Sequence, residues 1–207
     1  MAPITAIQFM VNGMLGSSLL KGENRKLSDK ETICTAAGAG IISSFLYSPV
    51  DLTTIQQQKL NKNPFQTITY LMKEYGTLSI FRGISSCAVR EAIYTAGYLG
   101  LAPVITSHLT NTDYFKENRF LASVSGACAA GIIAATLTHP VDTAKTIMQA
   151  DMSGTTWKNA RSTTIILYNE QGISSLYRGF IPRTIRICGA FFVCMSLNEM
   201  ATRWKNN

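Results

Sequence analysis

Four long stretches of this sequence contain no Asp, Glu, Lys or Arg, and this pattern limits the folds open to the chain. The uncharged stretches are Met1–Leu20, Thr32–Val50, Ala92–Thr112 and Phe120–Val141. A helix rising 1.5 Å per residue over any of them is long enough to cross roughly 30 Å of hydrocarbon. A fifth stretch, Ile187–Asn198, spans a membrane only together with the apolar residues before Arg186. We therefore expect five membrane-spanning helices and disfavour the alternative, a soluble helical protein with buried helices.

A proline–acid motif occurs twice, and each copy is followed by a glycine and then by an aromatic–arginine–glycine triplet. The first copy reads Pro49-Val50-Asp51, Gly76 and Phe81-Arg82-Gly83, and the second reads Pro140-Val141-Asp142, Gly172 and Tyr177-Arg178-Gly179. This is an internal repeat with a period of roughly 90 residues. The pattern predicts long helices near residues 2–20, 30–60, 82–109, 118–150 and 180–204, with short helices near 64–74 and 157–169. Each full repeat therefore consists of two long helices joined by a polar segment that contains a short helix.

Composition argues against several classes of function. The formal net charge is +7, but the bases are scattered and form no compact run, which favours anionic lipid headgroups over nucleic acid. The five cysteines lie in apolar segments without metal-ligand spacing, and His108 and His139 are isolated. We find no nucleophile–base pair and no cofactor motif. The sequence therefore indicates neither an enzyme nor a metal site, and we expect no cofactor beyond bound lipid.

The repeated motifs resemble those of the mitochondrial carrier family, in which Pro-x-acid-x-x-base precedes Gly and aromatic-base-Gly. The resemblance implies an all-α membrane protein: a carrier-like helical bundle with five transmembrane helices and two short matrix helices, in the mitochondrial inner membrane. Because Thr5-Ala6 is in phase with Thr95-Ala96, the first helix is expected to match an even-numbered family helix. The chain should then be a single truncated carrier-like domain, 1–207, that lacks the first family helix and first matrix loop. Its parts should be an unpaired even helix in 1–28, a second repeat in 29–112 and a third in 113–207.

The resemblance also assigns a matrix-side gate of ion pairs and glutamines. In the family, the acid of one proline helix meets the base three positions after the acid of the next. This logic pairs Asp51 with Lys145 and leaves Asp142 without an assigned partner, because its base would lie on the missing helix. Gln58 and Gln149 stand at the glutamine positions that brace this gate.

Substrate and lipid contacts follow from the same motifs. The family's midplane contact positions fall at Arg90, Glu91 and Arg186. An Arg–acid pair at the first two positions resembles the pair found in carriers of amino acids. Arg186 resembles the family's contact for anionic groups. The alternative is a leftover ion pair without a substrate. In the family, helices that follow such a triplet bind cardiolipin at their first turn. The resemblance therefore implies cardiolipin binding at Arg82, Gly83, Arg178 and Gly179. The alternative for these four residues is a simple turn.

Departures from the family pattern decide the functional expectation. Thr54 replaces a gate base, and the outer gate positions are also altered, at Gly13, Gly16, Pro103, Thr106 and Thr202. An open funnel would expose Gln8 and Asn12 to lipid, so that a partner must cover them. We therefore expect a carrier-derived accessory subunit that no longer transports and packs against other inner-membrane subunits of a larger assembly, such as a respiratory complex. The alternative is a mitochondrial solute carrier that exchanges amino acids or carboxylates across the inner membrane.

Overall fold

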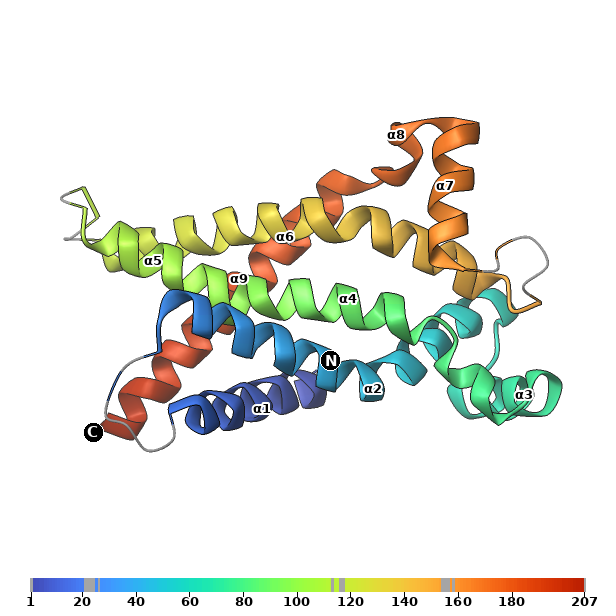
Figure 1. Cartoon of the computed structure of the whole chain (residues 1–207), viewed down its shortest axis with the longest axis horizontal. Coiled ribbons are helices and arrows are strands. Elements are labelled where there is room, and N and C mark those ends of the chain that lie inside the picture. The colour runs from blue at the N-terminus through green and yellow to red at the C-terminus, as the bar shows by residue number, and fades with distance from the viewer. Residues whose placement is uncertain are drawn as a thin grey trace.

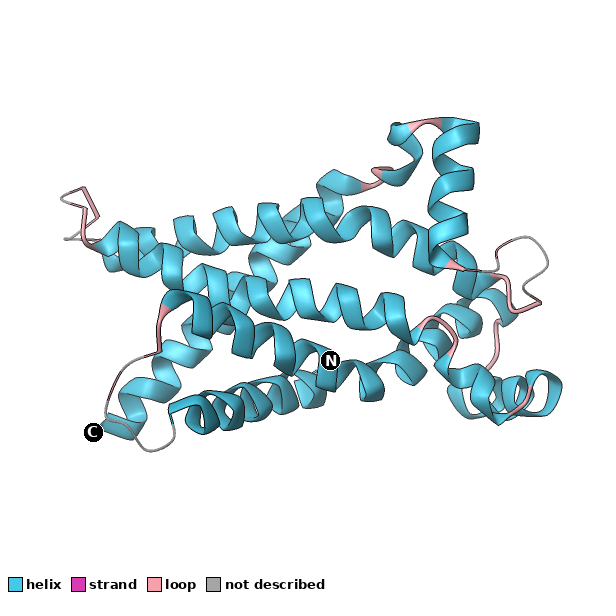
Figure 2. Cartoon of the chain, viewed as in Figure 1, coloured by secondary structure: helices cyan, strands magenta, loops and turns pink. Residues whose placement is uncertain are grey.

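The protein is an all-α bundle. The computed structural model describes residues 2–20, 25, 27–112, 114–115, 118–153, 157 and 159–206, and in these residues every regular element is a helix (Figure 2). The long elements are α1 (Ala2–Leu20), α2 (Asp29–Leu60), α4 (Ile84–Thr95) with η2 (Ala96–Leu101) and α5 (Ala102–Thr110), α6 (Arg119–Ala150), and α9 (Phe180–Asn206). Figure 1 shows α2, α4 and α6 running along the long axis, while α9 crosses the bundle obliquely.

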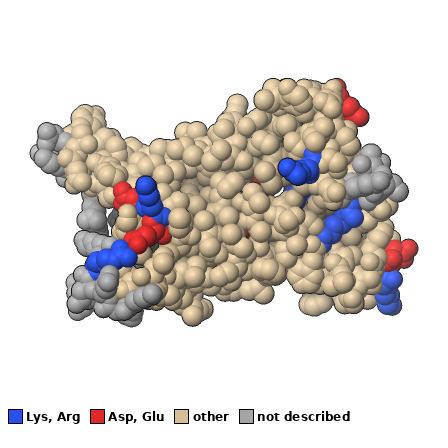
Figure 3. Space-filling model, viewed as in Figure 1, with Lys and Arg blue, Asp and Glu red and all other residues tan. Residues whose placement is uncertain are grey.

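Three described helical runs are long and apolar enough to cross a membrane, namely Asp29–Leu60, Phe120–Ala150 and Ile173–Leu197, and Ile4–Leu20 is a shorter apolar helix. The remaining expected span passes through α4, η2 and α5. Figure 3 shows charged side chains gathered at both ends of the visible face, with a wide band between them almost free of charge. Uncharged flanks between charged ends fit a hydrocarbon layer around the middle of the bundle.

Short helices lie together at one end of the molecule (Figure 1). They are α3 (Pro64–Tyr75), η1 (Thr77–Phe81), α7 (Ala160–Gln171) and α8 (Ile173–Leu176). Proline at the first position of α3 suits a helix start, because its missing N–H would have no partner there. Leu71 of α3 packs with Leu52 and Met152, and this small apolar cluster joins α3 to the end of α2 and to the residues that follow α6.

The fourth helical segment differs from its expected form. The sequence predicts one helix near 82–109, but α4 begins after Gly83, and the π-helix η2 interrupts it. Pro103 lies in the first turn of α5 and has no N–H to donate to a carbonyl four residues earlier. The backbone instead shifts register, and Ala102 N–H bonds to Gly97 O, five residues back.

Small residues bring the long helices close together. The main core gathers alanines with Tyr98, Ile187 and Phe191 from η2 and α9. On α2, a Cβ at Gly40 would overlap the backbone oxygen of Glu91, so only glycine permits this approach of α2 to α4. In lipid, such close backbone contact is a main source of helix association. This approach also brings Ser43 of α2 and Glu91 of α4 close enough for Gln8 to donate to both.

Candidate functional site

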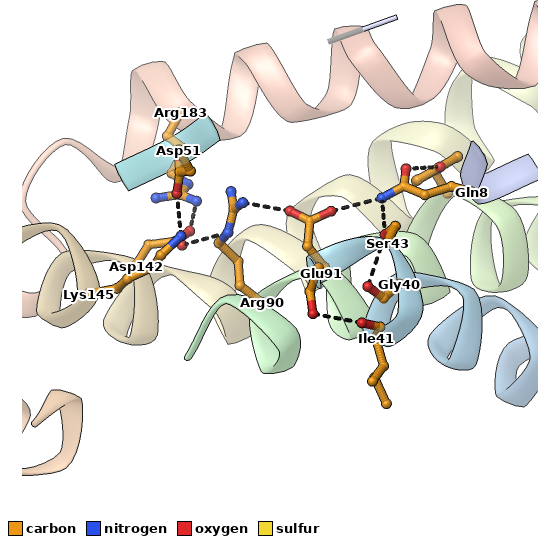
Figure 4. Close-up of polar contacts among 12 residues, drawn as sticks. Gln8, Gly40, Ile41, Ser43, Asp51, Arg90, Glu91, Asp142, Lys145 and Arg183 are labelled. Atoms are coloured by element: carbon orange, nitrogen blue, oxygen red, sulfur yellow. Dashed lines mark hydrogen bonds and ion pairs between the residues drawn. The ribbon is translucent and has the colours of Figure 1, made fainter. Parts of the chain in front are cut away.

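Six charged side chains from four helices form two neighbouring groups of ion pairs, Lys145–Asp51 and Glu91–Arg90–Asp142–Arg183, and we call the six together the ion-pair cluster (Figure 4). Its members are Asp51 from α2, Arg90 and Glu91 from α4, Asp142 and Lys145 from α6, and Arg183 from α9. Three acids and three bases balance one another. A charge at membrane depth is costly unless it is paired, so this balance is what allows six charges to persist inside the bundle.

Lys145 and Asp51 form the ion pair that the resemblance to the carrier family implies. The Lys145 side chain is almost fully buried, at 1% exposure. Tyr47 of α2 packs beside two of the cations. The centre of its ring lies 5.8 Å from Lys145 Nζ and 4.5 Å from the Arg90 guanidinium carbon. The aromatic face adds a favourable contact for both cations. The contact between α2 and α6 is thus present, and its role as a gate stays a prediction.

Asp142 has two cationic partners. Its Oδ1 lies 3.4 Å from Arg90 Nε, and its Oδ2 contacts Arg183 Nη2. The sequence interpretation left Asp142 without a partner and missed Arg183 altogether. A signal was present, because Arg183 is a charge near the start of an apolar helix, where an arginine is rare unless it is paired or functional.

Glu91 joins the ion-pair cluster to a buried polar chain from α1. Arg90 Nη2 lies 2.5 Å from Glu91 Oε1, and Gln8 Nε2 donates to Glu91 Oε2 at 2.8 Å and to Ser43 Oγ at 3.0 Å. The Tyr98 hydroxyl donates to Gln8 Oε1 at 2.6 Å. Gln8 is only 3% exposed. The expectation that Gln8 would be open to lipid is therefore wrong, because its amide is satisfied inside the bundle.

Arg186, which was predicted as a substrate contact together with Arg90 and Glu91, lies on α9. Its side chain is exposed and lines a pocket of about 520 Å³ between α6 and α9. The pocket is lined by His139, Asp142, Thr143, Thr146, Ile147, Arg178, Gly179, Pro182, Arg183 and Arg186. Three arginines face one carboxylate there, so the pocket suits an anion. Asp142 and Arg183 belong both to this pocket and to the ion-pair cluster, which makes the two one continuous region.

The two predicted gate glutamines differ in position. Gln149 is fully buried and its Nε2 donates to Arg82 O at 2.9 Å. Gln58 is exposed. Two residues earlier, Gln56 is buried, and its Nε2 donates to Gln149 O at 2.5 Å. Gln58 therefore points its side chain out of the bundle, and its role in the gate stays a prediction.

The predicted lipid-binding residues also divide into two kinds. Arg82 Nη2 donates to Trp157 O at 3.1 Å, so its guanidinium is engaged by the protein backbone, and Gly83 precedes α4 with φ +82°. Arg178 is exposed, and Gly179, with φ +81°, has open space around it. An anionic headgroup could thus approach the second pair more freely than the first. Lipid binding stays a prediction at both.

Comparison with known proteins gives consistent matches. The family model described as mitochondrial carrier protein matches residues 26–113 and 116–207. The chain is 28% identical to mitochondrial 2-oxodicarboxylate carrier 1 of Saccharomyces cerevisiae, with 96% of this chain and 67% of that protein covered. It is 26% identical to a probable mitochondrial 2-oxodicarboxylate carrier of Dictyostelium discoideum, over 98% and 69%. It is 28% identical to the glutamate/glycine mitochondrial carrier ymc1 of Schizosaccharomyces pombe, over 82% and 60%. The chain thus spans about two thirds of the length of these relatives.

These names contradict the expectation of an accessory subunit that no longer transports, because the relatives are named as carriers of small solutes. One physical ground for that expectation, polar groups exposed to lipid, fails as well for Gln8, Arg90 and Glu91, which are paired inside the bundle. The chain is a member of the mitochondrial carrier protein family.

Proposed function

We propose that this chain is a solute carrier, not an enzyme, and that it moves small carboxylate anions across the mitochondrial inner membrane. The candidate substrates are 2-oxodicarboxylates or acidic amino acids. The observation that carries the proposal is the continuity of the ion-pair cluster with the arginine-lined pocket. The names of the first two relatives support the 2-oxodicarboxylate class, and that of the glutamate/glycine carrier supports an amino acid.

Arginine geometry supports a substrate with more than one carboxylate. Arg183 and Arg186 are three residues apart on α9, so they share a helix face, and both line the pocket. Arg90 reaches the same region from α4 through Asp142. A guanidinium matches the planar fork of a carboxylate, which a lysine does not. Guanidinium groups from two helices can therefore hold the two ends of a short dicarboxylate.

Phospholipid is the partner that we propose for the second triplet. Exposed Arg178 and the open backbone at Gly179 lie at the start of α9, where the positive end of the helix dipole favours a phosphate. Native mass spectrometry should show fewer bound cardiolipin molecules for Arg178→Gln than for Arg161→Gln. Equal lipid retention by the two variants counts against this contact.

Exchange in liposomes tests the transport proposal. Purified protein is reconstituted into liposomes loaded with 2-oxoglutarate, and uptake of external labelled 2-oxoglutarate is followed over time. The proposal expects saturable uptake that requires internal anion and that unlabelled glutamate or longer 2-oxodicarboxylates reduce to different extents. Uptake equal to that of protein-free liposomes for every anion in the panel contradicts it.

A further inference from the structure

Two cysteines from different helices meet where α9 crosses α6 (Figure 1). Cys188 Sγ of α9 donates to Cys128 O of α6 at 3.6 Å, and the Cys128 thiol is a second hydrogen-bond partner of the same sulfur. Both thiols are free and half-buried. The two residues are 60 positions apart in the sequence, so this contact is made by the packing of the two helices and not by a local motif.

The backbones of α6 and α9 approach each other closely beside this contact. Gly131 follows Cys128 by three residues and shares its face of α6. A Cβ at Gly131 would lie 3.1 Å from Cys188 Cα, so the missing side chain allows α9 to come this near. A disulfide needs such an approach, because its two Cα atoms lie roughly 4.4–6.8 Å apart. Close backbones and thiols in contact together place the pair within reach of a bridge.

The pair lies in the charge-free part of both helices. Cys128 falls inside the uncharged stretch Phe120–Val141, and Cys188 falls inside Ile187–Asn198. Charged solutes enter hydrocarbon only at a high cost in free energy. A neutral hydroperoxide can therefore reach these sulfurs, whereas a charged thiol reductant is kept away from them.

We propose that Cys128 and Cys188 form a dithiol site that a hydroperoxide oxidises to a disulfide. One sulfur takes the terminal peroxide oxygen, and its proton passes to the other oxygen as the O–O bond breaks, which gives a sulfenic acid and an alcohol. The second sulfur then displaces the sulfenic hydroxyl, which leaves with the second thiol proton as water. The two thiols lose two electrons in total, and the peroxide accepts them. The hydroperoxide comes from a bilayer lipid or, as hydrogen peroxide, from the aqueous phase, and hydrogen peroxide gives water in place of the alcohol.

The bridge fixes α9 to α6 beside the arginine-lined pocket. Cys188 follows Arg183 by five residues and Arg186 by two, so the restraint acts within two helical turns of both arginines. A link across 60 residues also restricts the unfolded chain, which should raise the midpoint of thermal unfolding. An effect on transport rests on the function proposed above: exchange should slow, because α9 can no longer shift against α6. The bridge itself does not depend on that proposal.

The first experiment detects the bridge. Protein in lipid nanodiscs is treated with cumene hydroperoxide or hydrogen peroxide at equal concentrations, free thiols are blocked in denaturant, and tryptic peptides are identified by mass spectrometry. We expect peptide 120–145, which holds Cys128, to be linked to peptide 187–203 in protein that runs as a monomer. Faster linking by cumene hydroperoxide supports a source in the bilayer, and faster linking by hydrogen peroxide supports a source in water.

Peptide 187–203 holds both Cys188 and Cys194, so Cys194→Ser is the matched control. These two cysteines are six residues apart on α9, about 9 Å along the helix, which is too far for a bridge between them. Cys194→Ser should keep the link, whereas Cys128→Ser and Cys188→Ser should lose it. Exposed Cys34 shows that the oxidant has acted, because it should lose its free thiol in every variant.

The second experiment measures what the bridge does. The midpoint of thermal unfolding in lipid should rise by several degrees after oxidation and return after treatment with dithiothreitol, which is neutral and enters the bilayer. In liposomes, 2-oxoglutarate exchange should fall severalfold after oxidation and recover with the same reductant. Cys128→Ser should show neither change, and Cys194→Ser should show both.

The outcomes separate this inference from the transport proposal. Free Cys128 and Cys188 after Cys34 has been oxidised, or oxidation of either to a sulfinic acid without a link, overturns the dithiol site. A link that is lost in Cys194→Ser overturns it as well. A link with no exchange by either the reduced or the oxidised protein supports the dithiol site and contradicts the carboxylate carrier. Unchanged exchange by linked protein overturns the expected effect on transport and leaves the site standing.

Discussion

The two copies of the proline–acid motif have nearly the same sequence but different surroundings. Asp51 in the first copy has one cationic partner, Lys145, and its side chain is 22% exposed. Asp142 in the second copy has two, Arg90 and Arg183, and is 7% exposed. At the base position, Thr54 is exposed and bonds back to Val50 O of its own helix, whereas Lys145 is buried in the ion-pair cluster.

This difference shows that the copies are complementary halves of one arrangement. The first copy contributes an acid, and the second contributes both an acid and a base. The role of each motif residue depends on which side chains of the neighbouring helices contact it, and not on the motif alone. Variants at equivalent positions of the two copies therefore test the comparison directly, since identical roles would give equal effects.

Lys145→Ala should have the largest effect on stability. It leaves Asp51 at membrane depth without its cation, and breaking such a pair costs about 4 kcal/mol. The midpoint of thermal unfolding in lipid should fall by far more than for Lys73→Ala, whose side chain is exposed on α3. Similar midpoints for the two variants would show that the pair contributes little.

Gly40 and Gly131 both precede a motif proline by nine residues and offer the next comparison. A Cβ at Gly40 would lie 2.3 Å from the Glu91 backbone oxygen of α4, whereas one at Gly131 would lie 2.8 Å from the Cys188 side chain and no closer than 3.1 Å to its backbone. Gly40→Ala should cost about 3 kcal/mol, because backbone cannot give way as a side chain can. Gly131→Ala should cost less in the same unfolding measurement. The reverse order would contradict the close packing of α2 on α4.

Neutralising either motif acid should lower the stability of the protein. The loss should be larger for Asp51, although it has fewer cationic partners than Asp142. Asp51→Asn leaves the buried Lys145 ammonium with only an amide oxygen, at a cost of about 2 kcal/mol. Asp142→Asn should cost about half as much, because Arg90 retains Glu91 and Arg183 faces an open pocket. Denaturant titration of both variants checks the order, and a larger loss for Asp142→Asn would reverse the argument.

The two glutamine positions give the smallest expected difference. Gln149→Ala removes a buried hydrogen bond to Arg82 O and should cost about 1 kcal/mol. Gln58→Ala changes an exposed side chain and should stay within about 0.5 kcal/mol of the parent protein. Equal losses would place Gln58 in the gate after all.

The helices could be predicted from the sequence because charge-free length and proline position are local signals. The expected ranges for α2 and α6 agree with the structure to within about a residue at each end. The Asp51–Lys145 contact was also predictable, because the resemblance to the carrier family implies which motif residues of adjacent helices pair. The π-helix η2 was missed, because Pro103 was treated only as a departure from a family pattern.

Other parts of the site depend on packing that no repeat encodes. Arg183 reaches Asp142 across the α6–α9 seam, and Gln8 reaches Glu91 from a helix outside both matched repeats. Such partners are set by helix approach and by the reach of long side chains. The functional expectation failed because it treated altered gate positions as lost function, whereas the structure pairs the remaining charges in a different way.

The rate of anion exchange tests the central claim, a carboxylate carrier built around Arg90, most directly. Initial 2-oxoglutarate exchange is measured for the wild-type protein, Arg90→Ala and Arg25→Ala in the same liposomes. We expect saturable exchange by the wild type and Arg25→Ala, and a loss of about a hundredfold for Arg90→Ala, because a charged contact to the anion is removed. Wild-type exchange no faster than that of protein-free liposomes, or full exchange by Arg90→Ala, would contradict the claim.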